Sequence, residues 1–107
     1  MEGKIMKILF REPSNQPLKL MEIENDVEPI QKLIGGYFTA FPIRQDILCI
    51  CDEEGINKSL ETNFVDDRND EILGNVIFCG KDGDEFNSLS KGQIDFVEEY
   101  IGFPVIK

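Results

Sequence analysis

The sequence predicts an α+β domain in which a single, mainly antiparallel sheet of about five strands packs with two helices, in the order β-β-α-β-β-β-α. Short apolar runs separated by Pro, Gly, Asn and Asp predict the strands, and two segments with capping signals predict the helices. With 107 residues and 41% apolar side chains, the chain can bury one modest core without disulfides or metals. We therefore expect one domain over residues 1–107.

The chain begins with a predicted hairpin. Residues 4–10 are apolar enough for a first strand, and residues 18–23 alternate imperfectly, as expected of an edge strand that pairs with the first. Pro13 and Pro17 lie between these segments and predict a turn or an exposed loop.

The first helix is predicted to follow this hairpin and to end near residue 35. Asn25 and Glu28 have capping-box spacing, although Pro29 also allows a start at Glu28, because proline is tolerated in a first turn. The Gly35–Gly36 pair can adopt positive φ and is expected to end the helix. The predicted buried stripe consists of Val27, Ile30, Leu33 and Ile34.

Three further strands are predicted after the glycine pair. Residues 37–43 are the most hydrophobic and are expected inside the sheet, with a bulge or free stretch at Pro42, which cannot donate a ladder hydrogen bond. Residues 46–51 are apolar on both faces, and the β-branched run 75–79 predicts the last strand. Between and after these strands we expect a turn at 52–55, a segment at 56–64 that fits either a short helix or irregular chain, and polar loops at 65–71 and 80–85.

The last helix has the clearest boundary signals. Ser90 and Gln93 have capping-box spacing, and Gly102 predicts the helix end. Leu89 and Ile94 fit a hydrophobic staple. The residues expected to face the core are Ile94, Val97 and Ile101, with Phe96 and Tyr100.

The negative charge is concentrated in one segment. Of the net charge of −10, residues 52–85 carry −8, from 11 acidic and three basic residues, and the rest of the chain carries −2. Such charge repels nucleic-acid phosphates and anionic lipids, so we expect no direct nucleic-acid binding and no membrane binding. It suits either a solvated surface or a face that docks on a basic protein, such as an enzyme that handles nucleic acids. The predicted acidic face consists of Asp52, Glu53, Glu54, Asp66, Asp67, Asp70, Glu71, Asp82 and Asp84.

The three cysteines, Cys49, Cys51 and Cys79, lie within predicted strands. Because their spacing is Cys-x-Cys rather than Cys-x-x-Cys and the chain has no histidine, we expect them to pack in the core, with no metal and no cofactor. A catalytic cysteine would lack a base, and the carboxylates lie in polar loops, so we expect no catalytic residues. Three cysteines and a start without a charged-then-apolar leader favour the cytoplasm.

A small-molecule site is the alternative function. The residues best suited to line such a pocket are Gly35, Gly36, Tyr37 and Asn63, and the ligand would be a nucleotide-like molecule. Each of these residues also has a structural explanation. The glycine pair suits a helix end, Asn63 suits turn chemistry, and Tyr37 suits a half-buried ring with its hydroxyl at the rim.

Four blocks carry a family resemblance: Ile30-Gln31-x-x-Ile34-Gly35-Gly36-Tyr37, Asp52-Glu53-Glu54-Gly55, Asn63, and Gly74-x-Val76-Ile77. In this order they resemble an uncharacterised family, a domain of unknown function, of small proteins from bacteriophages, plasmids and bacteria with mobile elements. That family carries an LQ-x-x-VGGY block and an NEEG turn, and more often has asparagine where this chain has Asp52. The resemblance implies a habitat and no assigned activity. Together with the acidic segment, it predicts a non-catalytic accessory or inhibitory protein that docks on a basic host protein.

Overall fold

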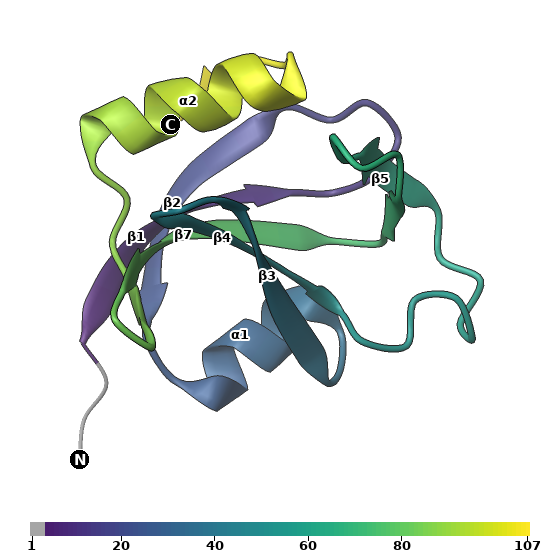
Figure 1. Ribbon diagram of the computed structural model, residues 1–107. Coiled ribbons are helices and arrows are strands. Elements are labelled where there is room, and N and C mark those ends of the chain that lie inside the picture. The colour runs from purple at the N-terminus through teal and green to yellow at the C-terminus, as the bar shows by residue number, and fades with distance from the viewer. Residues whose placement is uncertain (1–3) are drawn as a thin grey trace.

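The computed structural model describes residues 4–107 as a seven-stranded sheet, a separate two-stranded sheet and two helices (Figure 1). The α+β class, the mainly antiparallel pairing and the two helices are as predicted, whereas the strand number and the element order were predicted wrongly. The elements are β1 (Ile5–Arg11), β2 (Leu18–Glu24), α1 (Val27–Ile34), β3 (Phe38–Arg44), β4 (Ile47–Asp52), β5 (Thr62–Val65), β6 (Glu71–Leu73), β7 (Val76–Asp82), β8 (Glu85–Asn87), α2 (Lys91–Ile101) and β9 (Val105–Ile106).

The large sheet has the strand order β3-β4-β7-β1-β2-β9, and β8 pairs with the end of β7. All pairs are antiparallel except β2 with β9. Every residue of β4 is buried, which confirms the prediction from its apolar run. The first hairpin is confirmed by the register of β1 with β2, in which Ile8 lies opposite Met21.

Two hydrophobic clusters lie on opposite faces of the sheet, and each is covered by one helix (Figure 1). On one face α2 contributes the fully buried Val97, and the β5–β6 hairpin adds Ile72. On the other face α1 contributes Ile30 and Ile34. No helix in residues 4–107 is long and apolar enough to cross a membrane.

The predicted interior position of residues 37–43 is wrong, because β3 is an edge strand of the sheet. Its apolar residues contribute to both clusters from the margin: Phe41 and Ile43 pack on one face and Phe38 on the other. The register shifts between Pro42 and Arg44, as the bulge prediction required. A proline on an edge also limits pairing with another chain.

Helix α1 begins one residue later than the capping box at Asn25 predicted. Asp26 is the cap, and its carboxylate accepts the N–H of Val27 at 2.8 Å. The Asn25 amide donates instead to the carbonyl of Phe86 at 2.9 Å, which ties α1 to β8. Val27 was predicted to be buried, but it is 55% exposed. The helix ends at Gly35 with φ of 97°, as predicted.

The region predicted as loop and irregular chain contains additional short strands. Residues 56–64 form turns followed by β5, and β5 pairs with β6 across the polar turn at 66–70. Residues 75–79 are not the last strand, because β8 and β9 follow. These strands have two to four residues and were too short to show a period. The capping box of Ser90 and Gln93 and the αL residue Gly102 are confirmed in α2.

Candidate functional site

Several of the sequence blocks meet at one end of the sheet. Strand β3 begins opposite the end of β4, with Phe38 paired to Asp52, and β7 begins beside the same point, with Val76 paired to Cys51. The N–H of Glu53 donates to the Tyr37 carbonyl at 3.1 Å, which joins the turn after β4 to the exit of α1. We call this region the Asp52 end and define it as residues 35–37, 52–58 and 71–75.

Asp52 was predicted to lie on an acidic surface, but its side chain is buried. One carboxylate oxygen accepts the N–H of Glu54 at 2.7 Å, and the other pairs with Lys58 Nζ at 2.8 Å. Lys58 also donates to the Gly35 carbonyl at 3.3 Å. A Cβ at Gly36 would lie 2.7 Å from Lys58 Nζ, so glycine at this position leaves room for the lysine. Asp52 therefore links the turn after β4 to the end of α1 through Lys58.

Asp66 is the second predicted surface acid that is buried. Its carboxylate accepts the N–H groups of Asp70 at 2.9 Å and Arg68 at 3.0 Å, and it pairs with the Arg68 guanidinium at 3.1 Å. The Asp70 amide, and after it the Arg68 guanidinium, lower the pKa of this carboxyl below its ordinary value. Asp66 therefore closes the turn between β5 and β6.

The remaining predicted surface acids are exposed but do not gather on one face. Glu53 and Glu54 follow β4, and the turn between β5 and β6 and its flank carry Asp67, Asp70 and Glu71. Asp82 and Asp84 lie in the β7–β8 turn. Gly80, just before this turn, pairs with Ile47 at the start of β4, whereas Asp52 is at the end of β4. The β7–β8 turn therefore lies at the opposite end of the sheet from Asp52 (Figure 1, the light green turn at the lower left). A count of charges along the chain could not reveal this separation.

Asn63 does not join the predicted pocket at Gly35, Gly36 and Tyr37. It is buried, and its amide donates to the carbonyls of Arg11 at 2.9 Å and Gly74 at 2.8 Å. The Arg11 guanidinium donates in turn to the Asn63 side-chain oxygen at 3.0 Å and to its backbone carbonyl at 2.7 Å.

Arg11 is a buried cation that the sequence analysis missed. Its side chain is 2% exposed, and its guanidinium lies 4.4 Å from the centre of the Phe103 ring. Burial lowers the pKa of Arg11 from its ordinary value. Within residues 4–107 this guanidinium donates to Asn63 and to the carbonyl of Gln16, all neutral acceptors. The pairing of Arg11 with Asn63 is therefore structural and crosses from β1 to β5.

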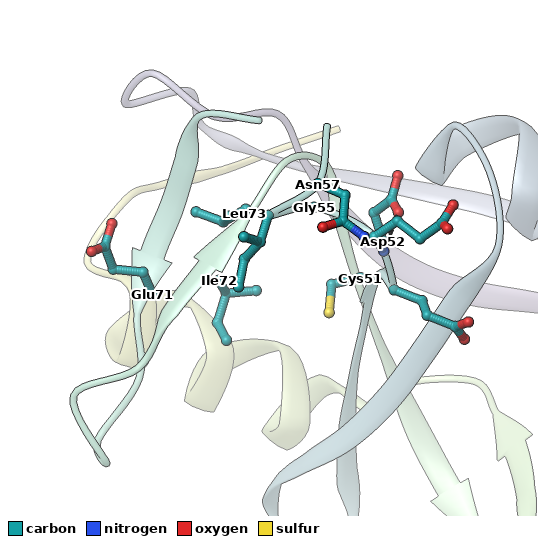
Figure 2. A pocket seen from close by; sticks show the side chains of 10 residues that line it. Cys51, Asp52, Gly55, Asn57, Glu71, Ile72 and Leu73 are labelled. Atoms are coloured by element: carbon teal, nitrogen blue, oxygen red, sulfur yellow. Dashed lines mark hydrogen bonds between the residues drawn. The ribbon is translucent and has the colours of Figure 1, made fainter. Parts of the chain in front are cut away.

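A hollow of about 350 Å³ lies between the turn after β4 and the strand β6, and we call it the β6 hollow. Figure 2 shows Cys51, Ile72 and Leu73 in its centre, Glu71 on one side, and Asp52 with Asn57 on the other. The Glu71 carboxylate points away from Cys51 and accepts the Thr62 hydroxyl at 2.5 Å. The hollow is lined by Cys51, Asp52, Glu53, Glu54, Gly55, Ile56, Asn57, Glu71, Ile72 and Leu73.

A second hollow of about 400 Å³, the Tyr37 hollow, lies on the other side of Glu54. It is lined by Gln31, Gly36, Tyr37, Glu54 and Lys58. The Tyr37 side chain is 67% exposed and Ile56 is 83% exposed, so neither is packed in the core. The two hollows therefore flank one exposed carboxylate, with one exposed apolar side chain beside each.

The cysteines are buried and unpaired, which confirms their predicted place in the core. Cys49 and Cys51 belong to the cluster under α2, whereas Cys79 belongs to the cluster under α1. Burial raises the pKa of Cys79 to about 12 and raises those of Cys49 and Cys51, so these thiols stay protonated near neutral pH. Within residues 4–107 no group of three Cys, Asp or Glu side chains is arranged to hold a metal ion.

A family model described as Domain of unknown function (DUF3846) matches residues 6–102. No curated protein matches the chain. No solved structure matches it either.

Proposed function

The chain belongs to the family described as Domain of unknown function (DUF3846), and we propose that it is a non-catalytic binding protein that docks on a basic protein surface through the Asp52 end. The proposal places it in the cytoplasm, as an accessory or inhibitory protein of a phage, plasmid or other mobile element, with a host protein as its partner. The four sequence blocks support this setting, and the geometry of the Asp52 end supports the docking.

One observation carries the proposal: exposed apolar side chains and exposed carboxylates adjoin at the Asp52 end. Tyr37 and Ile56 lie on either side of Glu54 and are largely solvent-exposed. Single exposed apolar residues are common on protein surfaces. An aromatic ring and an aliphatic side chain around one turn, with charged groups between them, instead resemble the anchor residues and polar rim of a protein interface.

The charges of Glu53 and Glu54 are not cancelled by an ion pair within residues 4–107. Lys58 is engaged by the buried Asp52, and among the ion pairs of residues 4–107 neither Glu53 nor Glu54 takes part. With a net charge of −10 for the whole chain, long-range attraction would speed the encounter with a basic partner and would weaken as salt rises. The same field disfavours nucleic acids and anionic membranes.

Paired charge removals at the two ends of the sheet test this proposal. The protein is immobilised and used to capture its partner from a lysate of the organism that carries the gene, at low and high salt. The variant Glu53→Gln/Glu54→Gln should reduce capture at low salt by about three- to tenfold. The control Asp82→Asn/Asp84→Asn makes the same change in net charge at the opposite end and should leave capture nearly intact. Equal losses in both variants, or no captured protein at low salt, would overturn the proposal.

A small-ligand function has one supporting observation, the Tyr37 hollow. An exposed ring beside Lys58 could stack on a nucleobase, and the hollow is large enough for part of a nucleotide. Glu54 lines the same hollow and repels phosphate, and Lys58 is already bound to Asp52. A thermal-shift panel of nucleotides on the native chain and on Tyr37→Ala decides this. A shift that is lost in the variant supports the ligand site, and no shift with any nucleotide removes it.

A further inference from the structure

We propose that the β6 hollow receives one lysine or arginine side chain of the basic partner. This inference rests on the proposed function and specifies which chemical group of the partner is recognised. The occupant is defined by two features of the hollow: an apolar floor that suits an aliphatic stem, and a carboxylate rim that suits a cationic head.

The floor of the hollow is apolar and is formed by the end of β4 in the large sheet and by β6 in the two-stranded sheet. Cys51 is the next-to-last residue of the buried strand β4, and Ile72 packs in the core cluster under α2. Leu73 lies beside Ile72 and faces the turn after β4 (Figure 2). A stem of methylene groups can cover this floor while its charged head stays at the solvent-facing rim.

Gly55 sets the width of the hollow. A Cβ at this position would lie 3.1 Å from the Leu73 Cβ, closer than ordinary contact, so a side chain would push the turn away from β6. The glycine therefore lets the turn that carries Glu53 and Glu54 lie directly against the floor. The volume of about 350 Å³ is at the small end of ligand pockets and is sufficient for one long side chain.

The charges around the hollow select a cation. Glu53 and Glu54 are exposed at its rim and unpaired within residues 4–107, whereas the Glu71 carboxylate points away from the floor and accepts the Thr62 hydroxyl. No lysine or arginine lines it, because Lys58 borders the Tyr37 hollow instead. An anionic occupant would be repelled. A neutral occupant would remove water from these carboxylates without supplying a charge that offsets the lost solvation. A guanidinium or an ammonium satisfies both requirements.

The first experiment uses four blocked tripeptides as probes and the isotope-labelled full chain as receptor. Gly-Arg-Gly and Gly-Lys-Gly carry the proposed side chain, and Gly-citrulline-Gly and Gly-norleucine-Gly keep a similar stem without the charge. In an NMR titration, the cationic peptides should give saturable shifts at the amides of Cys51, Gly55 and Asn57, at least about fivefold tighter than the neutral peptides. Equal responses to charged and neutral peptides, or shifts confined to the β7–β8 turn, would overturn the inference.

The second experiment separates this inference from the proposed function. Asn57→Trp fills the hollow at an exposed position and leaves the net charge unchanged, so it should abolish the peptide shifts and reduce partner capture. Its fold is checked by the amide spectrum of α2, which lies away from the hollow. If Asn57→Trp captures the partner as well as the native chain while Glu53→Gln/Glu54→Gln does not, the inference fails and the proposed function stands. If Glu53→Gln/Glu54→Gln captures it normally, the proposed function fails.

Discussion

Replacing Asn63 by alanine should remove a large part of the stability of this fold. The substitution deletes an amide that gives one hydrogen bond each to the carbonyls of Arg11 and Gly74 and receives one from the Arg11 guanidinium, all in buried surroundings. The two bonds to carbonyls contribute about 1 kcal/mol each, and the bond from a charged donor about 1.5–2 kcal/mol. The expected loss is therefore about 4 kcal/mol, against a total of about 5–15 kcal/mol for a domain of ordinary size.

Urea unfolding followed by circular dichroism measures this loss. With a slope of about 2 kcal/mol per molar urea, the midpoint should fall by about 2 M. Asn57→Ala is the matched control, because it makes the same chemical change at an exposed turn position and should alter stability by less than about 0.5 kcal/mol.

A second mutation identifies the source of the effect. In the Arg11→Met background, Asn63→Ala should cost about 1–2 kcal/mol less than in the native chain, because the charged donor is already gone. A loss below about 1.5 kcal/mol for Asn63→Ala alone, or identical losses in both backgrounds, would refute the assignment of Arg11 and Asn63 as one hydrogen-bonded unit.

Three further outcomes are expected. Because the folded pKa of Asp66 is lowered, its contribution to stability is complete above the unfolded value of about 3.9 and is lost as pH falls through the folded value, so Asp66→Asn should flatten the acid limb of a stability–pH curve. Gly36→Ala should cost at most about 1 kcal/mol, by displacing the flexible end of Lys58 from Asp52, and almost nothing in a Lys58→Ala background. Ser90→Ala should cost about 1 kcal/mol through the lost cap of α2. Urea midpoints report all three.

Each of these outcomes has a result that would contradict it. An acid limb of unchanged slope in Asp66→Asn would mean that its hydrogen bonds to Asp70 and Arg68 do not hold in solution. An undiminished cost of Gly36→Ala in the Lys58→Ala background would place the clash elsewhere than at the lysine. A Ser90→Ala variant as stable as the native chain would show that α2 does not depend on its capping box.

The elements that the sequence predicted well are those specified by neighbouring residues. The capping box of Ser90 and Gln93 and the glycine that ends each helix involve atoms a few residues apart, so local chemistry determines them. The buried strand β4 was also predictable, because its apolar run continues on both faces.

Strand position could not be predicted in this way. The hydrophobic run at 37–43 suggested an interior strand, but which strands flank it depends on pairings with segments far along the chain. Strand β4 already pairs with β7 on its other side, and β7 with β1, so β3 is left at the edge. The parallel pairing of β9 with β2, through Val105 and Leu18, likewise depends on where the end of α2 places the chain that follows it.

The predicted acidic face was wrong for Asp52 and Asp66, which are buried. The number of charges in a segment does not show whether each side chain points to solvent or into the protein. Asp52 and Asp66 are each followed two residues later by a backbone N–H that their carboxylate accepts, from Glu54 and Arg68. This is the Asx-turn pattern that favours aspartate for local structural reasons. The following cations, Lys58 and Arg68, were visible in the sequence and could have indicated that both acids are neutralised within the chain.

The residues of the sequence blocks fall into two sets. The polar groups of the inward set form hydrogen bonds within the chain, and the side chains of the outward set are exposed to solvent. Asp52, Asn63 and Gly74 commit their polar groups to the chain itself: Asp52 to Lys58, Asn63 to Arg11, and Gly74 to the Glu61 carbonyl at 2.7 Å. These contacts hold the turn after β4 and the β5–β6 hairpin beside it in place.

The outward set would supply the contacts of the proposed interface. It consists of the block residues Tyr37, Glu53 and Glu54 together with their neighbours Ile56 and Asn57, all of which are exposed and lie outside the two core clusters of residues 4–107. Glu53, Glu54, Ile56 and Asn57 lie on the turn after β4, and the N–H of Glu53 joins this turn to the Tyr37 carbonyl. These backbone contacts reduce the ordering entropy that a partner's binding would cost. A mutation in the inward set should therefore lower stability and binding together, whereas one in the outward set should lower binding alone. Measuring both quantities for Asn63→Ala and Glu53→Gln/Glu54→Gln distinguishes a supporting residue from a contacting one.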